Sequence, residues 1–120
     1  MVRILVVDDE PELRFLARVM LERAGYEVVE AKDGAEALSK LEQHEISLVL
    51  LDVMMPGDDG WVVCRRIKER HSVPVVMFTV RTSERDKKKS QECGADAHVN
   101  KPFDREELLR VVRKMLESQG

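Results

Sequence analysis

The sequence predicts an α/β fold of the doubly wound type, in which helices cover both faces of a parallel sheet. Short apolar or β-branched runs alternate with amphipathic helical patterns along the chain. Several of these runs are apolar at consecutive positions, as at residues 48–51 and 75–78, and a strand of this kind has to be buried on both of its faces. Parallel strands joined by crossover helices satisfy that requirement.

The alternation of strand and helix repeats five times. Strands are expected at residues 4–7, 26–30, 48–51, 75–79 and 97–99. The helical patterns that follow them lie at residues 11–24, 33–41, 60–70, 83–94 and 104–116. The fourth helix is the weakest, because its sequence offers few inward apolar groups beyond Cys93. No linker, repeat or low-complexity segment interrupts the pattern, so we expect a single domain over residues 1–120.

Residues that favour helix ends support these boundaries. Pro11 suits the first turn of the first helix, and Gly25 suits its C-terminal stop. Asp33 opens the second helix, while Asp104 with Glu107 three residues later makes a capping-box-like start for the last. The face of the first helix that is expected to point inward carries Leu13, Leu16, Ala17, Met20 and Ala24.

The composition argues against several classes of partner. The chain has 120 residues with 20 basic and 23 acidic side chains, so it lacks the basic surface that nucleic acid binding requires. The first apolar run, at residues 4–7, is far too short for a signal peptide or a spanning helix, and we expect a cytoplasmic protein without membrane contact. Cys64 and Cys93 have no metal or redox spacing and are expected to be buried, reduced thiols.

Polar side chains follow four of the five predicted strands. Asp8 and Asp9 follow the first, Asp52 the third, Thr79 ends the fourth, and Lys101 comes shortly after the fifth. Each has an ordinary structural explanation when taken alone, such as a helix cap, a turn residue or a surface charge. Because the carboxyl ends of parallel strands meet at one edge of the sheet, we expect these five side chains to lie together.

Together these groups predict phosphoryl transfer. Three carboxylates make an oxygen-rich site suited to Mg²⁺, with Mn²⁺ as a substitute, and a divalent cation would offset the repulsion between Asp8 and Asp9. Asp52 would supply the nucleophilic oxygen, and Thr79 and Lys101 would neutralise oxygens of the transferring phosphoryl group. The product would be an aspartyl phosphate.

The stretches "ILVVDDE", "LLDVMMPGDDGW", "MFTV" and "GADAHVNKPF" resemble, in order and spacing, the receiver domain of two-component response regulators. The resemblance implies a flavodoxin-like (βα)5 fold with strand order 2-1-3-4-5. It also implies that Asp52 accepts a phosphoryl group from a sensor histidine kinase, and that the Met54 backbone carbonyl joins Asp8, Asp9 and Asp52 around Mg²⁺. Thr79 and Lys101 match the phosphate-contacting hydroxyl and lysine.

The resemblance further implies a signalling domain whose output passes through a face made by the fourth predicted helix (residues 83–94), the fifth predicted strand (97–99) and the fifth predicted helix (104–116). Its partners would be the kinase and a downstream effector protein or domain, with a phosphorylation-dependent dimer through the same face left open. Two positions depart from the family pattern. His98 replaces the usual aromatic switch residue, and is either a pH-dependent switch or an ordinary strand residue. Val80 replaces a small residue and is expected to slow phosphoryl exchange.

Two functions from other classes fit the sequence less well. A Mg²⁺-dependent phosphohydrolase with an aspartyl nucleophile would carry Asp-x-Asp after the first strand, whereas here adjacent acids follow that strand and a lone Asp52 follows the third. A flavin- or nucleotide-binding module would need a glycine- or hydroxyl-rich phosphate loop at the place where Asp8 and Asp9 would repel phosphate. A signalling switch, which is not an enzyme acting on a separate substrate, fits the sequence better than either.

Overall fold

A parallel sheet of five strands forms the centre of the structure, a computed structural model that describes residues 2–55, 57–79, 88, 92–100 and 104–118. Its strands are β1 (Arg3–Val7), β2 (Glu27–Ala31), β3 (Leu48–Asp52), β6 (Val75–Thr79) and β7 (Ala97–Asn100). They lie in the order β2-β1-β3-β6-β7. Numbered along the chain, these five strands have the predicted order 2-1-3-4-5, which is therefore confirmed.

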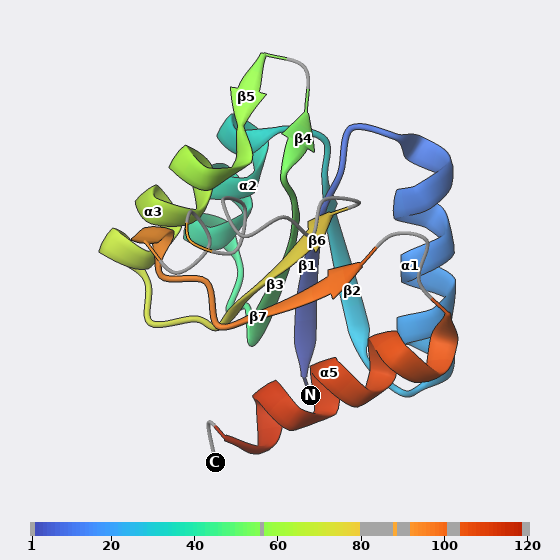
Figure 1. The fold of residues 1–120 in the computed structure, drawn as a ribbon. Helices are drawn as coiled ribbons and strands as arrows, with labels where there is room; N and C mark the ends of the chain where they lie inside the picture. The colour runs from blue at the N-terminus through green and yellow to red at the C-terminus, as the bar shows by residue number, and fades with distance from the viewer. Residues whose placement is uncertain (1, 56, 80–87, 89–91, 101–103, 119–120) are drawn as a thin grey trace.

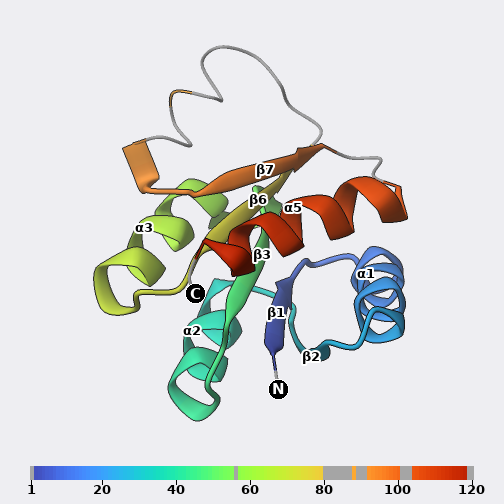
Figure 2. The ribbon, with the colours of Figure 1, turned by 90° about the horizontal axis from the view of Figure 1, so that it is seen from below.

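Helices cover both faces of the sheet (Figure 1). One face carries α1 (Pro11–Arg23) and α5 (Arg105–Glu117), and the other carries α2 (Gly34–Gln43) and α3 (Gly60–Arg70). The view from below shows the sheet between these two helical layers (Figure 2). The helix expected at residues 83–94 falls mostly outside the described residues. Among the helices of the described ranges, none has both the length and the apolar character of a membrane span.

The sheet divides the apolar core into two clusters, and consecutive residues of β3 point to opposite ones. Val49 and Leu51 belong to the cluster beneath α2 and α3, whereas Leu48 and Leu50 belong to the cluster beneath α1 and α5. All four side chains are fully buried. This is the reason for the continuous apolar run in the sequence, since a strand covered on both faces has no solvent-facing position.

The helix ends follow the predicted chemistry. The carboxylates of Asp33 and Asp104 accept hydrogen bonds from the backbone N–H groups of Glu36 and Glu107, each at 2.8 Å. Gly25 follows α1 with φ of +97°, a conformation that favours glycine.

The predicted inward position of Leu16 in α1 is wrong. Its side chain is 43% exposed, beside Phe15 at 63%, while Leu21 is fully buried. The helix is rotated so that Ala17 and Leu21 face the sheet, and the periodic apolar pattern could not distinguish Leu16 from Leu21 because both fit the same broad stripe.

The amino ends of β3 and β6 meet at the far edge of the sheet, where the loops that precede them line a groove. The residues of this amino-edge groove include His44, Glu45, Ile46, His71 and Pro74. His71 Nε2 lies 3.9 Å from Glu42 Oε1 across the ends of α2 and α3. The groove is thus at the opposite end of the strands from Asp8 and Asp52.

Candidate functional site

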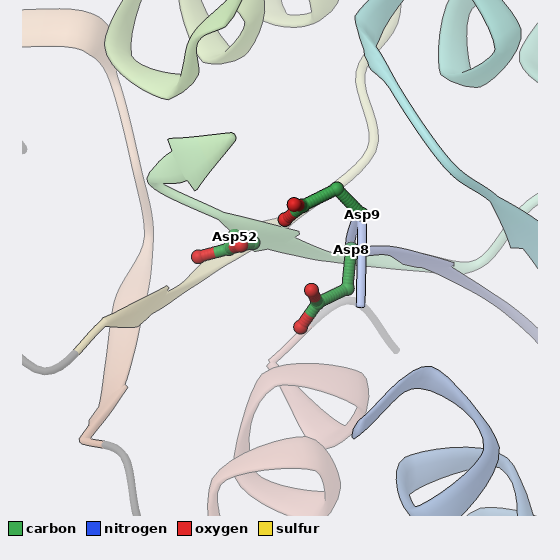
Figure 3. A group of neighbouring side chains, drawn as sticks. All are labelled: Asp8, Asp9 and Asp52. Carbon is green, nitrogen blue, oxygen red and sulfur yellow. The ribbon is translucent and has the colours of Figure 1, made fainter. Parts of the chain in front are cut away.

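Three carboxylates meet at the carboxyl edge of the sheet. Asp8 and Asp9 follow the end of β1, and Asp52 is the last residue of β3, the strand paired with β1 through Val7 and Leu51. One carboxylate oxygen from each of the three lies within 4.8 Å of the others. Figure 3 shows the three side chains grouped beside the strand ends. The geometry agrees with the predicted convergence of these residues.

Burial makes the repulsion within this acidic triad costly. The side chain of Asp8 is fully buried, Asp52 is 2% exposed and Asp9 is half-buried. At an effective dielectric constant near 20, two charges at this separation repel by roughly 3 kcal/mol. An all-oxygen donor set with excess negative charge fits Mg²⁺ or Mn²⁺, which prefer carboxylate, carbonyl and water ligands. Asp8, Asp9 and Asp52 are therefore the described residues that could hold the cation.

The backbone around the acidic triad is fixed by hydrogen bonds. Asp8 donates its N–H to Ala31 O on β2 at 3.1 Å, and its Oδ1 accepts from the Glu10 N–H at 2.9 Å. The Val53 N–H, which directly follows Asp52, donates to Phe78 O on β6 at 3.4 Å. The end of β1 is thus held by β2, and the end of β3 is held by β6.

A short antiparallel ribbon follows Asp52, and the sequence reasoning missed it. It pairs β4 (Met54–Met55) with β5 (Asp58–Asp59), with Met54 opposite Asp59. The available signal was Pro56-Gly57 between the two pairs, a dipeptide typical of turns. The ribbon returns the chain to the site.

Gly60, at the start of α3, makes a close approach to the site strand. Its N–H donates to Val53 O at 3.2 Å, and a Cβ at this position would lie 2.5 Å from Val53 Cα. Only glycine fits that spacing.

The structure describes only some of the other predicted site residues. Thr79 ends β6 opposite Asn100, and its neighbour Phe78 pairs with Asp52, so the backbone of Thr79 lies at the same sheet edge. Lys101 and Val80 lie outside the described residues. His98 lies on β7 opposite Met77 with an exposed side chain.

The two cysteines lie away from the site. Cys64 and Cys93 are free thiols, 0% and 3% exposed, and Cys64 Sγ donates to Cys93 O at 3.6 Å. Hydrogen bonding to Cys93 and burial raise the pKa of Cys64. Their predicted burial is confirmed.

The fold and this site define a class, namely doubly wound α/β proteins of the CheY-like flavodoxin fold with an acidic cluster at the carboxyl edge. A solved structure of the Vibrio cholerae chemotaxis protein CheY4 superposes with a TM-score of 0.93 and 33% identity, covering 97% of this chain and 99% of that one. The family model for the response regulator receiver domain matches residues 4–113. The chain belongs to the response regulator receiver domain family.

Two curated relatives agree with this assignment. The chain is 42% identical over 114 residues to the transcriptional regulatory protein ResD of Bacillus subtilis (strain 168), and 44% identical to the transcriptional activator protein IrlR of Burkholderia pseudomallei (strain 1026b). Each alignment covers 95% of this chain, but 48% of ResD and 50% of IrlR. The chain therefore spans about half the length of these relatives.

Proposed function

We propose that this chain accepts a phosphoryl group on Asp52 from a sensor histidine kinase, in a reaction that depends on Mg²⁺ or its substitute Mn²⁺. The observation that carries the proposal is the acidic triad, in which oxygens of Asp8, Asp9 and Asp52 lie within 4.8 Å of one another. Membership of the receiver domain family supports the same conclusion. Among the three acids, Asp52 is the one at the end of the central strand β3, in the position that the family motif assigns to the acceptor.

In the proposed reaction a carboxylate oxygen of Asp52 attacks the phosphorus of the donor. The bond from phosphorus to the donor's histidine nitrogen breaks, the nitrogen keeps the electron pair and takes a proton from solvent, and an aspartyl phosphate forms. Asp8, Asp9 and the Met54 backbone carbonyl would hold the cation, which supplies positive charge for the phosphoryl oxygens. The Thr79 hydroxyl and the Lys101 ammonium would donate hydrogen bonds to the same oxygens.

The output of the switch is proposed to pass through α5, β7 and the segment that precedes β7. His98 lies on this face with an exposed side chain, which is compatible with a switch that responds to pH. The relatives ResD and IrlR are named as transcriptional regulators, and their extra length supports an effector domain as the downstream partner. A phosphorylation-dependent dimer through the same face and a cytoplasmic location complete the proposal.

The test is intact-mass measurement after incubation with Mg²⁺ and a small acyl phosphate. The wild type is expected to gain the mass of one phosphoryl group, and a chelator should abolish the gain. Asp52→Asn should gain none. Asp59→Asn is the matched control, because Asp59 caps α3 by accepting from the Trp61 N–H at 2.9 Å and asparagine caps equally well. A mass gain in Asp52→Asn equal to that of the wild type would assign the acceptor elsewhere.

A further inference from the structure

The guanidinium of Arg14 on α1 touches the backbone of the acidic triad without touching a carboxylate of it. Arg14 Nη1 donates to the backbone oxygen of Asp8 at 2.7 Å, and Arg14 Nε donates to Glu30 Oε1 at 2.9 Å. The side chain of Arg14 is 19% exposed and that of Glu30 is 27% exposed. Two short, largely buried, charge-assisted contacts fix the guanidinium in one position.

These contacts close a ring of hydrogen bonds at the end of β1. Asp8 donates its N–H to Ala31 O on β2 and accepts from Arg14 through its C=O, while Arg14 holds Glu30, the neighbour of Ala31. Both backbone groups of Asp8 are therefore tied to the carboxyl end of β2, one directly and one through α1. Rotation of the Asp8 backbone, which would carry the carboxylate with it, has to break a contact of this ring, while the Glu10 N–H holds the carboxylate itself.

A second arginine holds Glu30 from the other side. Arg18 Nη1 donates to Glu30 Oε2 at 2.7 Å, and Arg18 Nε donates to Glu22 Oε1 at 3.1 Å. Glu30 thus has both of its oxygens engaged by arginines one helical turn apart. The acceptor that fixes Arg14 is itself immobilised.

We propose that Arg14 is a positioning residue for the cation site, holding the Asp8 carboxylate in its ligating orientation through the Asp8 backbone. The inference rests on the proposed function, since it concerns the same cation. Groups that orient metal ligands commonly affect metal affinity by tenfold or more when they are removed. The sequence alone does not single out Arg14, because its partner Glu30 lies 16 residues further along the chain.

Simple electrostatics makes the opposite prediction, and this separates the two explanations. A positive charge near three carboxylates competes with a bound cation, so its removal alone would strengthen cation binding. A positioning role requires that loss of Arg14 weakens binding in spite of the lost charge. The sign of the change is therefore diagnostic.

The experiment measures the dissociation constant of Mn²⁺ by electron paramagnetic resonance of the free ion, without any phosphoryl donor. Arg14→Gln is expected to bind Mn²⁺ roughly tenfold more weakly than the wild type. Arg14→Lys keeps the charge but lacks the fork that spans Asp8 and Glu30, and is expected to bind more weakly as well. The matched control is Arg3→Gln, which removes the same charge and the 3.4 Å ion pair of Arg3 with Glu27 at the amino ends of β1 and β2.

Circular dichroism establishes whether each variant is folded. If Arg14→Gln does not fold, the affinity of Arg14→Lys for Mn²⁺ still tests the positioning role. Wild-type affinity in Arg14→Lys, or equal or tighter binding in Arg14→Gln, overturns the positioning role and leaves the proposed function intact. Failure of the wild type itself to bind Mn²⁺ and to gain a phosphoryl group overturns the proposed function.

Discussion

The carboxylate of Asp8 is fully buried, so repulsion from the other two acids of the triad destabilises the protein when no cation offsets it. In the presence of a chelator, Asp8→Asn is expected to be more stable than the wild type by about 1 to 2 kcal/mol, because one repulsive charge is removed. Asparagine can still accept the hydrogen bond from the Glu10 N–H. Mg²⁺ should raise the melting temperature of the wild type more than that of the variant.

Thermal unfolding followed by circular dichroism, with chelator and with Mg²⁺, checks this prediction. Ser39→Ala, an exposed change on α2, serves as the control for a substitution unrelated to the site. A variant less stable than the wild type in chelator would show that the three acids do not destabilise the cation-free protein.

Glu30 gives the molecule a pH-dependent contribution to stability. Burial opposes ionisation of this carboxyl group, but the hydrogen bonds from Arg18 and Arg14 outweigh burial and lower its pKa below the ordinary value of 4.5. Because the pKa of Glu30 is lower in the folded than in the unfolded protein, the ionised carboxylate stabilises the folded state at pH values above about 4.5. This contribution is lost as the pH falls through the folded-state pKa.

Glu30→Gln is therefore expected to be less stable than the wild type by about 1 kcal/mol near neutral pH. The difference should shrink as the pH is lowered below about 4.5. Urea unfolding at a series of pH values measures it. A difference in stability that stays constant into the acid range would show that ionisation of Glu30 does not contribute to the stability of the folded protein.

At the scale of the elements, the approach of α3 to β3 depends on one glycine. A Cβ at Gly60 would meet Val53 Cα at 2.5 Å and Asp52 O at 2.8 Å, both backbone atoms that cannot move aside alone. Gly60→Ala is expected to lower the free energy of unfolding by about 2 to 4 kcal/mol. Because the contact involves Asp52 itself, the variant should also bind Mn²⁺ more weakly.

Gly25→Ala is the comparison. Gly25 has a φ of +97° but open space around its Cβ position, so alanine there should cost only about 1 to 2 kcal/mol of backbone strain. Denaturant unfolding and Mn²⁺ titration of both variants provide the measurement. Equal losses of stability in the two variants would mean that the close approach to Val53 adds nothing beyond conformational strain.

The elements also show where sequence reasoning succeeds and why. The strands at residues 48–51 and 75–78 were predictable because a strand covered on both faces is apolar at consecutive positions. The starts of α2 and α5 were predictable because Asp33 and Asp104 act locally as caps. The β4–β5 ribbon was not predictable in the same way. Each of its strands has two residues, too few for any periodicity to appear.

The candidate site likewise has a part that the sequence predicts and a part that it does not. Convergence of Asp8, Asp9 and Asp52 followed from topology, since parallel strands bring their carboxyl ends to one edge. The contact of Arg14 with Glu30, 16 residues further along the chain, depends on how α1 is rotated over the sheet. The misplaced inward position of Leu16 has the same origin, because a broad apolar stripe leaves that rotation undetermined.

For the molecule as a whole, β3 couples the two core clusters. Its consecutive residues Leu50 and Leu51 are fully buried in different clusters, so neither helical layer can separate without exposing the shared sheet. We expect the protein to unfold in one cooperative transition. Leu50→Ala and Leu51→Ala should each lower stability by about 2 to 5 kcal/mol.

Trp61 is the single tryptophan and belongs to the cluster beneath α2 and α3, so its fluorescence follows that cluster alone. Far-ultraviolet circular dichroism follows the whole fold. In urea, both signals should show the same midpoint for the wild type and should shift together in Leu50→Ala. Independent unfolding of the two layers would instead shift the dichroism of Leu50→Ala without the fluorescence.

The amino-edge groove has a practical consequence, because the length of the sheet separates it from the chemistry. Five residues of β3 span about 16 Å between the two edges. The exposed side chain of Glu45 borders this groove, and both native thiols are buried. A dye or surface tether coupled through Glu45→Cys would therefore react at one place, away from the acidic triad, so that the proposed phosphorylation of Asp52 could be followed in individual molecules.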